Sequence, residues 1–66
     1  MRRTDFYERL TEVFGPAYAA SVAADQVLPQ LGGRTIDTAL ADGEEVHVIW
    51  RAVCEQYSER VPGRLR

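Results

Sequence analysis

The chain of 66 residues contains no lysine and no asparagine, and it has one cysteine and one histidine. The single Cys54 excludes an intramolecular disulfide, and Cys54 with His47 provides too few ligands for a zinc site made of protein groups alone. No apolar run approaches the roughly 20 residues that a bilayer-spanning helix needs. Arg2 and Arg3 lead into a charged, amphipathic segment that does not resemble a signal peptide. We therefore expect a soluble cytoplasmic protein that uses no metal or other cofactor and no membrane.

The formal net charge of −2 is unevenly distributed along the chain. All ten acidic residues lie between Asp5 and Glu59, and only three arginines lie within that span. The other five arginines occupy the two ends, at Arg2, Arg3, Arg60, Arg64 and Arg66. An acidic body repels nucleic acid, whereas basic ends attract phosphate. The simpler interpretation is that the terminal arginines are only solvated.

Apolar spacing predicts an all-α fold, a small three-helix bundle with an additional short linking helix. We expect helices over residues 5–14, 16–28, 36–42 and 44–58, with no strand. Gly15 should end the first helix and Pro16 begin the second, because proline is tolerated at a first helical position. Thr35 should cap the third helix, and Gly43 should end it.

The whole chain should form one domain over residues 1–66, ordered over about 4–61, with a frayed basic tail at 62–66. The second helix is rich in alanine, which permits close approach of a neighbouring helix. The predicted core comprises Phe6, Leu10, Phe14, Tyr18, Val22, Leu28, Leu31, Ile36, Leu40, Ile49, Trp50 and Val53.

Catalysis is not expected from this set of residues. A cysteine nucleophile needs an activating base, but His47 precedes Cys54 by seven residues on one predicted helix. At 1.5 Å per residue the two are about 10 Å apart along the axis. Cys54 is therefore interpreted as a partly buried structural residue and His47 as a surface residue. The carboxylates of the chain sit at helix starts or on polar faces, where solvation explains them.

Two interaction modes are open. The spacing of Ala39, Gly43 and Ile49 loosely matches a helix-turn-helix, but Glu44 and Glu45 would then direct negative charge at DNA. A tryptophan beside an arginine is a common interface anchor, although Trp50 is more readily a core residue with its indole N–H at the edge. The candidate interaction surface comprises Arg34, His47, Trp50, Arg51 and Glu55.

Five segments together resemble a known family: Phe14-Gly-Pro-Ala-Tyr18, Asp25-Gln-Val-Leu28, Leu31-Gly-Gly-Arg-Thr35, Ala39-Leu40 with Gly43, and Ile49-Trp-Arg-Ala-Val-Cys-Glu55. The chain is similar over nearly its whole length to the short actinobacterial proteins grouped as domain of unknown function 3046. The resemblance implies no catalytic residue and no cofactor. Family members are often encoded near the recombinase RecA and its regulator RecX, which implies a connection with DNA repair.

The sequence thus favours a non-catalytic protein-binding or regulatory module whose partner protein is unknown. The alternative is an accessory protein that binds nucleic acid, through the helix-turn-helix-like unit or the basic ends, and is linked to DNA repair. A third interpretation is a homo-oligomer that buries the outer face of the second helix, and the sequence leaves the oligomeric state open.

Overall fold

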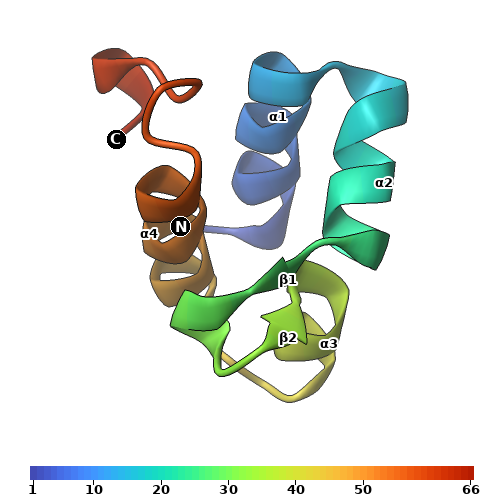
Figure 1. Cartoon of the computed structure of the whole chain (residues 1–66). Helices are drawn as coiled ribbons and strands as arrows, with labels where there is room; N and C mark the ends of the chain where they lie inside the picture. The colour runs from blue at the N-terminus through green and yellow to red at the C-terminus, as the bar shows by residue number, and fades with distance from the viewer.

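The computed structural model describes all residues, 1–66, and shows a predominantly helical chain with one small antiparallel sheet (Figure 1). The elements in chain order are α1 (Arg3–Phe14), α2 (Pro16–Asp25), β1 (Val27–Leu28), η1 (Pro29–Leu31), β2 (Arg34–Thr35), α3 (Ile36–Ala41), α4 (Val46–Gln56) and η2 (Gly63–Leu65). The all-α expectation is therefore right only in outline, because it omitted the sheet.

The turn between α1 and α2 forms at the predicted residues. Gly15 has φ 84° and ψ 155°, a conformation essentially restricted to glycine, and Pro16 begins α2. The start of α1 differs from the expectation, because the helix begins at Arg3. Asp5 is thus inside the first turn, where its carboxylate accepts the backbone N–H of Arg2 at 3.4 Å. This places a negative charge at the positive end of the helix dipole.

The second helix is shorter than predicted, since α2 ends at Asp25 and not at Leu28. Pro29 disfavours a helical conformation in the residue before it, and Leu28 is accordingly extended, with φ −109° and ψ 122°. The extended pair then forms a ladder in which Val27 lies opposite Thr35 and Leu28 opposite Arg34. The expectation of no strand was therefore wrong at this point.

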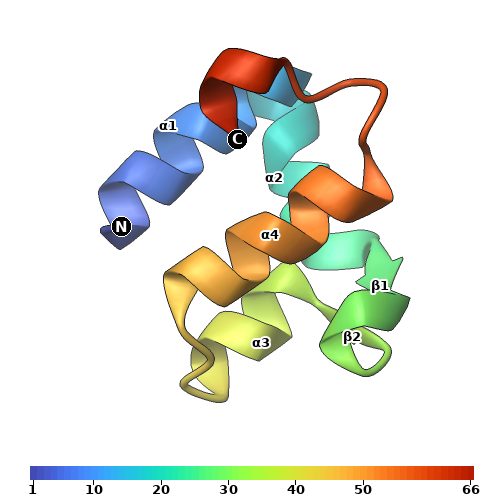
Figure 2. The same cartoon turned by 90° about the vertical axis from the view of Figure 1, so that its left-hand side faces the viewer.

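The third helix follows the prediction closely. The Thr35 hydroxyl accepts the backbone N–H of Thr38 at 3.1 Å and so caps α3. The turn after α3 contains Gly43 with φ 84°, and α4 begins at Val46, two residues later than expected. Figure 2 shows α4 lying across the molecule between α3 and the α1–α2 pair.

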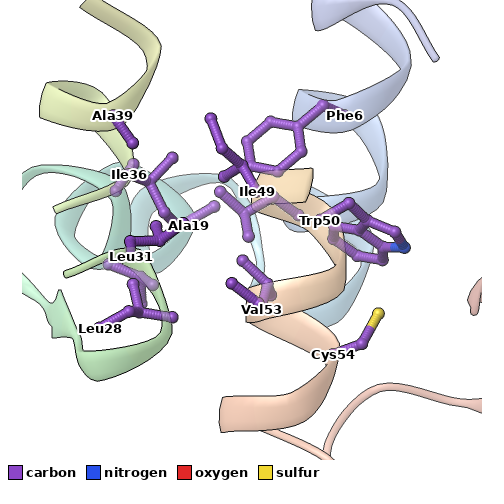
Figure 3. Close-up of a cluster of buried hydrophobic side chains, with 14 of the residues drawn as sticks. Phe6, Ala19, Leu28, Leu31, Ile36, Ala39, Ile49, Trp50, Val53 and Cys54 are labelled. Carbon is purple, nitrogen blue, oxygen red and sulfur yellow. The ribbon is translucent and has the colours of Figure 1, made fainter. Parts of the chain in front are cut away.

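The core confirms eleven of the predicted residues and corrects one. Tyr18 is 49% exposed, because the inner face of α2 is occupied by the smaller Ala19, Val22 and Ala23. Two of the five alanines of the helix, Ala19 and Ala23, therefore face the core, and the other three are exposed. Figure 3 shows part of the core. Its full membership is Phe6, Leu10, Phe14, Ala19, Val22, Ala23, Leu28, Leu31, Ile36, Ala39, Leu40, Ile49, Trp50, Ala52, Val53, Cys54 and Val61.

The carboxyl-terminal residues pack against the rest of the chain, in contrast to the expected frayed tail. Val61 is buried, and the indole Nε1 of Trp50 donates a hydrogen bond to the Leu65 carbonyl at 2.9 Å. Arg64 forms an ion pair with Glu12 of α1. This segment lies near the carboxyl end of α1 in Figure 2.

Candidate interaction face and the hollow beside α4

Helix α4 supplies both a large part of the core and one exposed stripe. The exposed side chains share one side of the helix because their spacing follows its 3.6-residue period. We call this stripe the α4 face; it consists of His47, Val48, Arg51 and Glu55. Val48 is 36% exposed, so the face offers an apolar surface between charged groups.

A hollow of about 260 Å³ lies on one flank of this face. It is lined by residues of α1, α4 and both ends of the chain, namely Met1, Arg9, His47, Trp50, Arg51, Cys54 and Arg66. In Figure 3 the side chains of Trp50 and Cys54 lie on the side of α4 away from Leu28 and Leu31. The hollow is therefore on the opposite flank of α4 from the small sheet.

The charged side chains of the hollow are all basic. Arg9, Arg51 and Arg66 line it, and no aspartate or glutamate does. The guanidinium of Arg66 is held in place because it donates hydrogen bonds to the carbonyl oxygens of Val61, at 3.2 Å, and Ser58. A chain with more acids than bases thus concentrates positive charge at one small site.

Cys54 lies at the hollow with its side chain buried. Burial raises the pKa of the Cys54 thiol above its ordinary value, while the nearby charges of Arg66 and Arg9 act in the lowering direction. No hydrogen bond joins His47 to Cys54, and Nδ1 of His47 lies 3.2 Å from Oε2 of Glu45. Cys54 is buried, as the interpretation of it as a partly buried residue predicted.

Arg34 does not line the hollow and has a different environment from the other candidate residues. Its guanidinium contacts Asp42 at 3.2 Å and Glu44 at 2.9 Å, and its Nε donates to the Leu31 carbonyl at 2.7 Å. Hydrogen bonds to Glu44 and Asp42 raise the pKa of Arg34. These contacts tie the loop before α3 to the turn before α4, which is a structural role.

The remaining candidate residues divide between the core and the α4 face. Trp50 is 3% exposed, and its buried ring packs edge-on against Phe6 with the ring centroids 5.8 Å apart. His47, Arg51 and Glu55 are exposed as expected. Arg51 and Glu55, four residues apart on α4, do not form an ion pair. Sequence reasoning named Arg66 only as one of the arginines of the basic ends, and it missed Arg9, whose position outside the apolar stripe of α1 gave no sign of a site.

The helix-turn-helix-like spacing corresponds to α3, the turn at Gly43, and α4. Glu45 is the residue that precedes the first turn of α4, and its carboxylate is 72% exposed. The end of α4 that would approach DNA in such a motif therefore carries exposed negative charge.

No helix has the length and apolar character needed to cross a membrane. No group of three or more histidine, cysteine or acidic side chains is arranged to hold a metal ion.

The fold and this site define a small, mostly helical protein with a basic hollow beside its central helix. The family model described as "Protein of unknown function (DUF3046)" matches residues 1–64, and the chain belongs to this family. Comparison with curated proteins finds no match, and comparison with solved structures finds none either.

Proposed function

We propose that the chain is a non-catalytic, cytoplasmic module that binds or regulates a partner protein through the α4 face. The observation that carries this proposal concerns Arg51, which is exposed on α4 and makes no ion pair or hydrogen bond within the chain. Arginine is enriched at protein interfaces, where its planar donors bind carboxylates in a forked geometry.

The neighbours of Arg51 support the same proposal. Val48 provides an apolar contact, and His47 and Glu55 provide polar groups at the edge of the face. The partner surface that fits this arrangement carries a carboxylate opposite Arg51 and an apolar side chain opposite Val48. The absence of catalysis is part of the proposal, and it is supported by the raised pKa of the Cys54 thiol, which disfavours the nucleophilic thiolate.

The test is affinity purification from the native host after crosslinking in the cell, with wild type and an Arg51→Glu variant compared as baits. An Ala20→Glu variant is the control, because Ala20 is exposed on α2 and tolerates a helix-forming residue. A partner protein should be recovered with wild type and Ala20→Glu and lost with Arg51→Glu. Circular dichroism should show all three folded. Retention of every partner by a folded Arg51→Glu protein would contradict the proposal.

A second candidate function is that of a nucleic-acid accessory protein linked to DNA repair. It is favoured by the convergence of Arg9, Arg51 and Arg66 on one side of the molecule, where they present guanidinium groups to phosphate. It is opposed by the exposed carboxylate of Glu45 at the start of α4. Three phosphate contacts predict that the logarithm of the binding constant falls with the logarithm of salt concentration with a slope of about −3. Absence of DNA binding at low salt would rule it out.

A further inference from the structure

The three arginines of the hollow come from separate parts of the chain. Arg9 belongs to α1, Arg51 to α4, and Arg66 follows η2, so only the folded chain brings them together. Arg9 and Arg51 make no ion pair or hydrogen bond within the chain, and no aspartate or glutamate side chain lines the hollow. Like charges gathered at one place repel one another, and an anion bound among them relieves that repulsion.

One of the three arginines, Arg66, is held in place before any ligand arrives. The hydrogen bonds from Arg66 to the Val61 and Ser58 carbonyls use its Nε and one terminal nitrogen and leave the other terminal nitrogen without a partner. Trp50 holds the preceding residue, Leu65, through its indole N–H. An arginine held in this way loses less conformational entropy when it binds a ligand.

Cys54 also lines the hollow, beside the same arginines. The charges of Arg9 and Arg66 act to lower the pKa of its thiol, although the larger effect of burial raises that pKa overall. The positive charge of these two side chains thus reaches the hollow both from α1 and from the carboxyl end of the chain.

We propose that this hollow is a binding site for a small phosphate-bearing anion, held by Arg9, Arg51 and Arg66. The guanidinium fork matches the oxygens of a phosphate group. The volume of about 260 Å³ is smaller than the roughly 300–1,000 Å³ of sites for drug-sized ligands, which favours a compact ligand.

The negative charges outside the hollow favour the binding of a compact anion over that of a long one. Glu45 and Glu55 are exposed on and beside the α4 face, and they repel a polyanion that extends past the hollow. A free pyrophosphate or phosphorylated metabolite can lie wholly among the arginines. The site therefore goes beyond the proposed function, since it needs no partner protein.

Pyrophosphate is the probe, titrated into the purified full chain at about 0.15 M salt. Trp50 is the only tryptophan and lines the hollow, so its fluorescence reports occupancy, and calorimetry gives the stoichiometry. We expect saturable binding of one pyrophosphate per chain. Arg9→Gln and Arg51→Gln should each weaken it by about tenfold or more, because each removes charge-assisted hydrogen bonds.

Arg60→Gln is the matched control. It removes the same charge, but Arg60 lies over the Phe14 ring, 4.9 Å from its centroid, and does not line the hollow. The affinity of the Arg60→Gln protein for pyrophosphate should stay within about twofold of the wild-type affinity, a change of about 0.4 kcal/mol. Circular dichroism establishes that each variant is folded.

Three results would overturn the proposal. One is the absence of saturable pyrophosphate binding by the folded wild-type chain. Another is an equal loss of affinity in Arg60→Gln, which would indicate a net-charge effect. The third comes from a single-stranded oligonucleotide of about 12 nucleotides: if it binds more tightly than pyrophosphate and displaces it, the source of the phosphate is nucleic acid.

Discussion

The indole nitrogen of Trp50 donates a hydrogen bond to the carbonyl oxygen of Leu65 at 2.9 Å, across fifteen residues of sequence. The ring of Trp50 is buried in the core, and Leu65 is half-buried beside it. One polar contact thus joins the central helix to the carboxyl-terminal turn. It also fixes the residue before Arg66, which lines the hollow.

Replacing Trp50 by phenylalanine should lower the free energy of unfolding by about 1–3 kcal/mol, because the Leu65 carbonyl loses its donor and the core loses volume. Urea unfolding followed by circular dichroism measures this change. Tyr18→Phe is the control, since the Tyr18 ring is exposed and its hydroxyl makes no hydrogen bond within the chain. Equal unfolding midpoints for Trp50→Phe and wild type would show that the contact contributes nothing.

Alanine substitutions at neighbouring positions of α4 should differ greatly in how much they lower the free energy of unfolding. Ile49 is fully buried, and Ile49→Ala should cost about 2–5 kcal/mol of stability through lost contacts and a cavity. Val48 is on the exposed α4 face, and Val48→Ala should change stability by no more than about 0.5 kcal/mol. Thermal and urea unfolding of both variants provide the comparison. Similar costs at the two positions would contradict the orientation of α4.

Substitution at Gly15 should destabilise the hairpin of α1 and α2. An alanine there must adopt φ 84° and ψ 155°, a strain of about 1–3 kcal/mol. Gly63→Ala is the matched control, because Gly63 has no positive φ and open space around the position of a Cβ atom. That control should be neutral or stabilise by about 0.4–1 kcal/mol. Comparable unfolding midpoints for the two variants would argue against the strained turn.

Alkylation of Cys54 should be slow near neutral pH and should accelerate only above the ordinary thiol value of 9.0, because burial raises its pKa. Arg9→Gln should slow the reaction further at a fixed pH, since removing a nearby positive charge disfavours the thiolate. The rate of reaction with iodoacetamide, measured against pH by mass spectrometry, checks both statements. An alkylation rate equal to that of free cysteine would contradict the raised pKa of Cys54. Faster alkylation in the Arg9→Gln protein would contradict the effect assigned to Arg9.

Stability should fall in alkaline solution. Burial raises the pKa of the Cys54 thiol and of the Tyr57 hydroxyl, so the folded chain retains these protons at pH values where the unfolded chain releases them. The contribution of these two groups to the free energy of unfolding is fully present below their ordinary pKa values of 9.0 and 10.0. It is lost as the pH rises through their pKa values in the folded chain. Urea unfolding between pH 8 and pH 11 measures this loss. A constant free energy of unfolding over that range would contradict it.

The sequence was sufficient to locate the helices and most of the core. Gly15, Pro16 and Thr35 have local roles that depend on their own backbone chemistry, and all three were placed correctly. The end of α2 was predicted too late, although Pro29 contained the necessary signal about the residue before it. The two-residue strands were missed because so short a ladder has no alternating pattern.

The exposure of Tyr18 and the composition of the hollow depend on tertiary structure. Tyr18 was assigned to the core as a large apolar ring, but the neighbouring helix approaches α2 closely over alanine and leaves no room there. Arg9 and Arg51 are 42 positions apart in the sequence, and no periodicity relates residues of different helices. Three residues of the α4 face, His47, Arg51 and Glu55, were named from the sequence, because a single helical period relates them. Val48 was not named, and Trp50 was included although it is buried.

The central position of α4 has a consequence for how this molecule can diversify. Nearly every inward-facing residue of α4 belongs to the core. Substitutions at these positions are therefore constrained by the need to fold alone. Within α4, the positions where substitution should leave the fold intact are the four residues of the α4 face and the exposed Gln56 at the end of the helix. Under the proposed function, relatives that bind different partners should differ along this one narrow strip, while the buried residues of the helix stay the same.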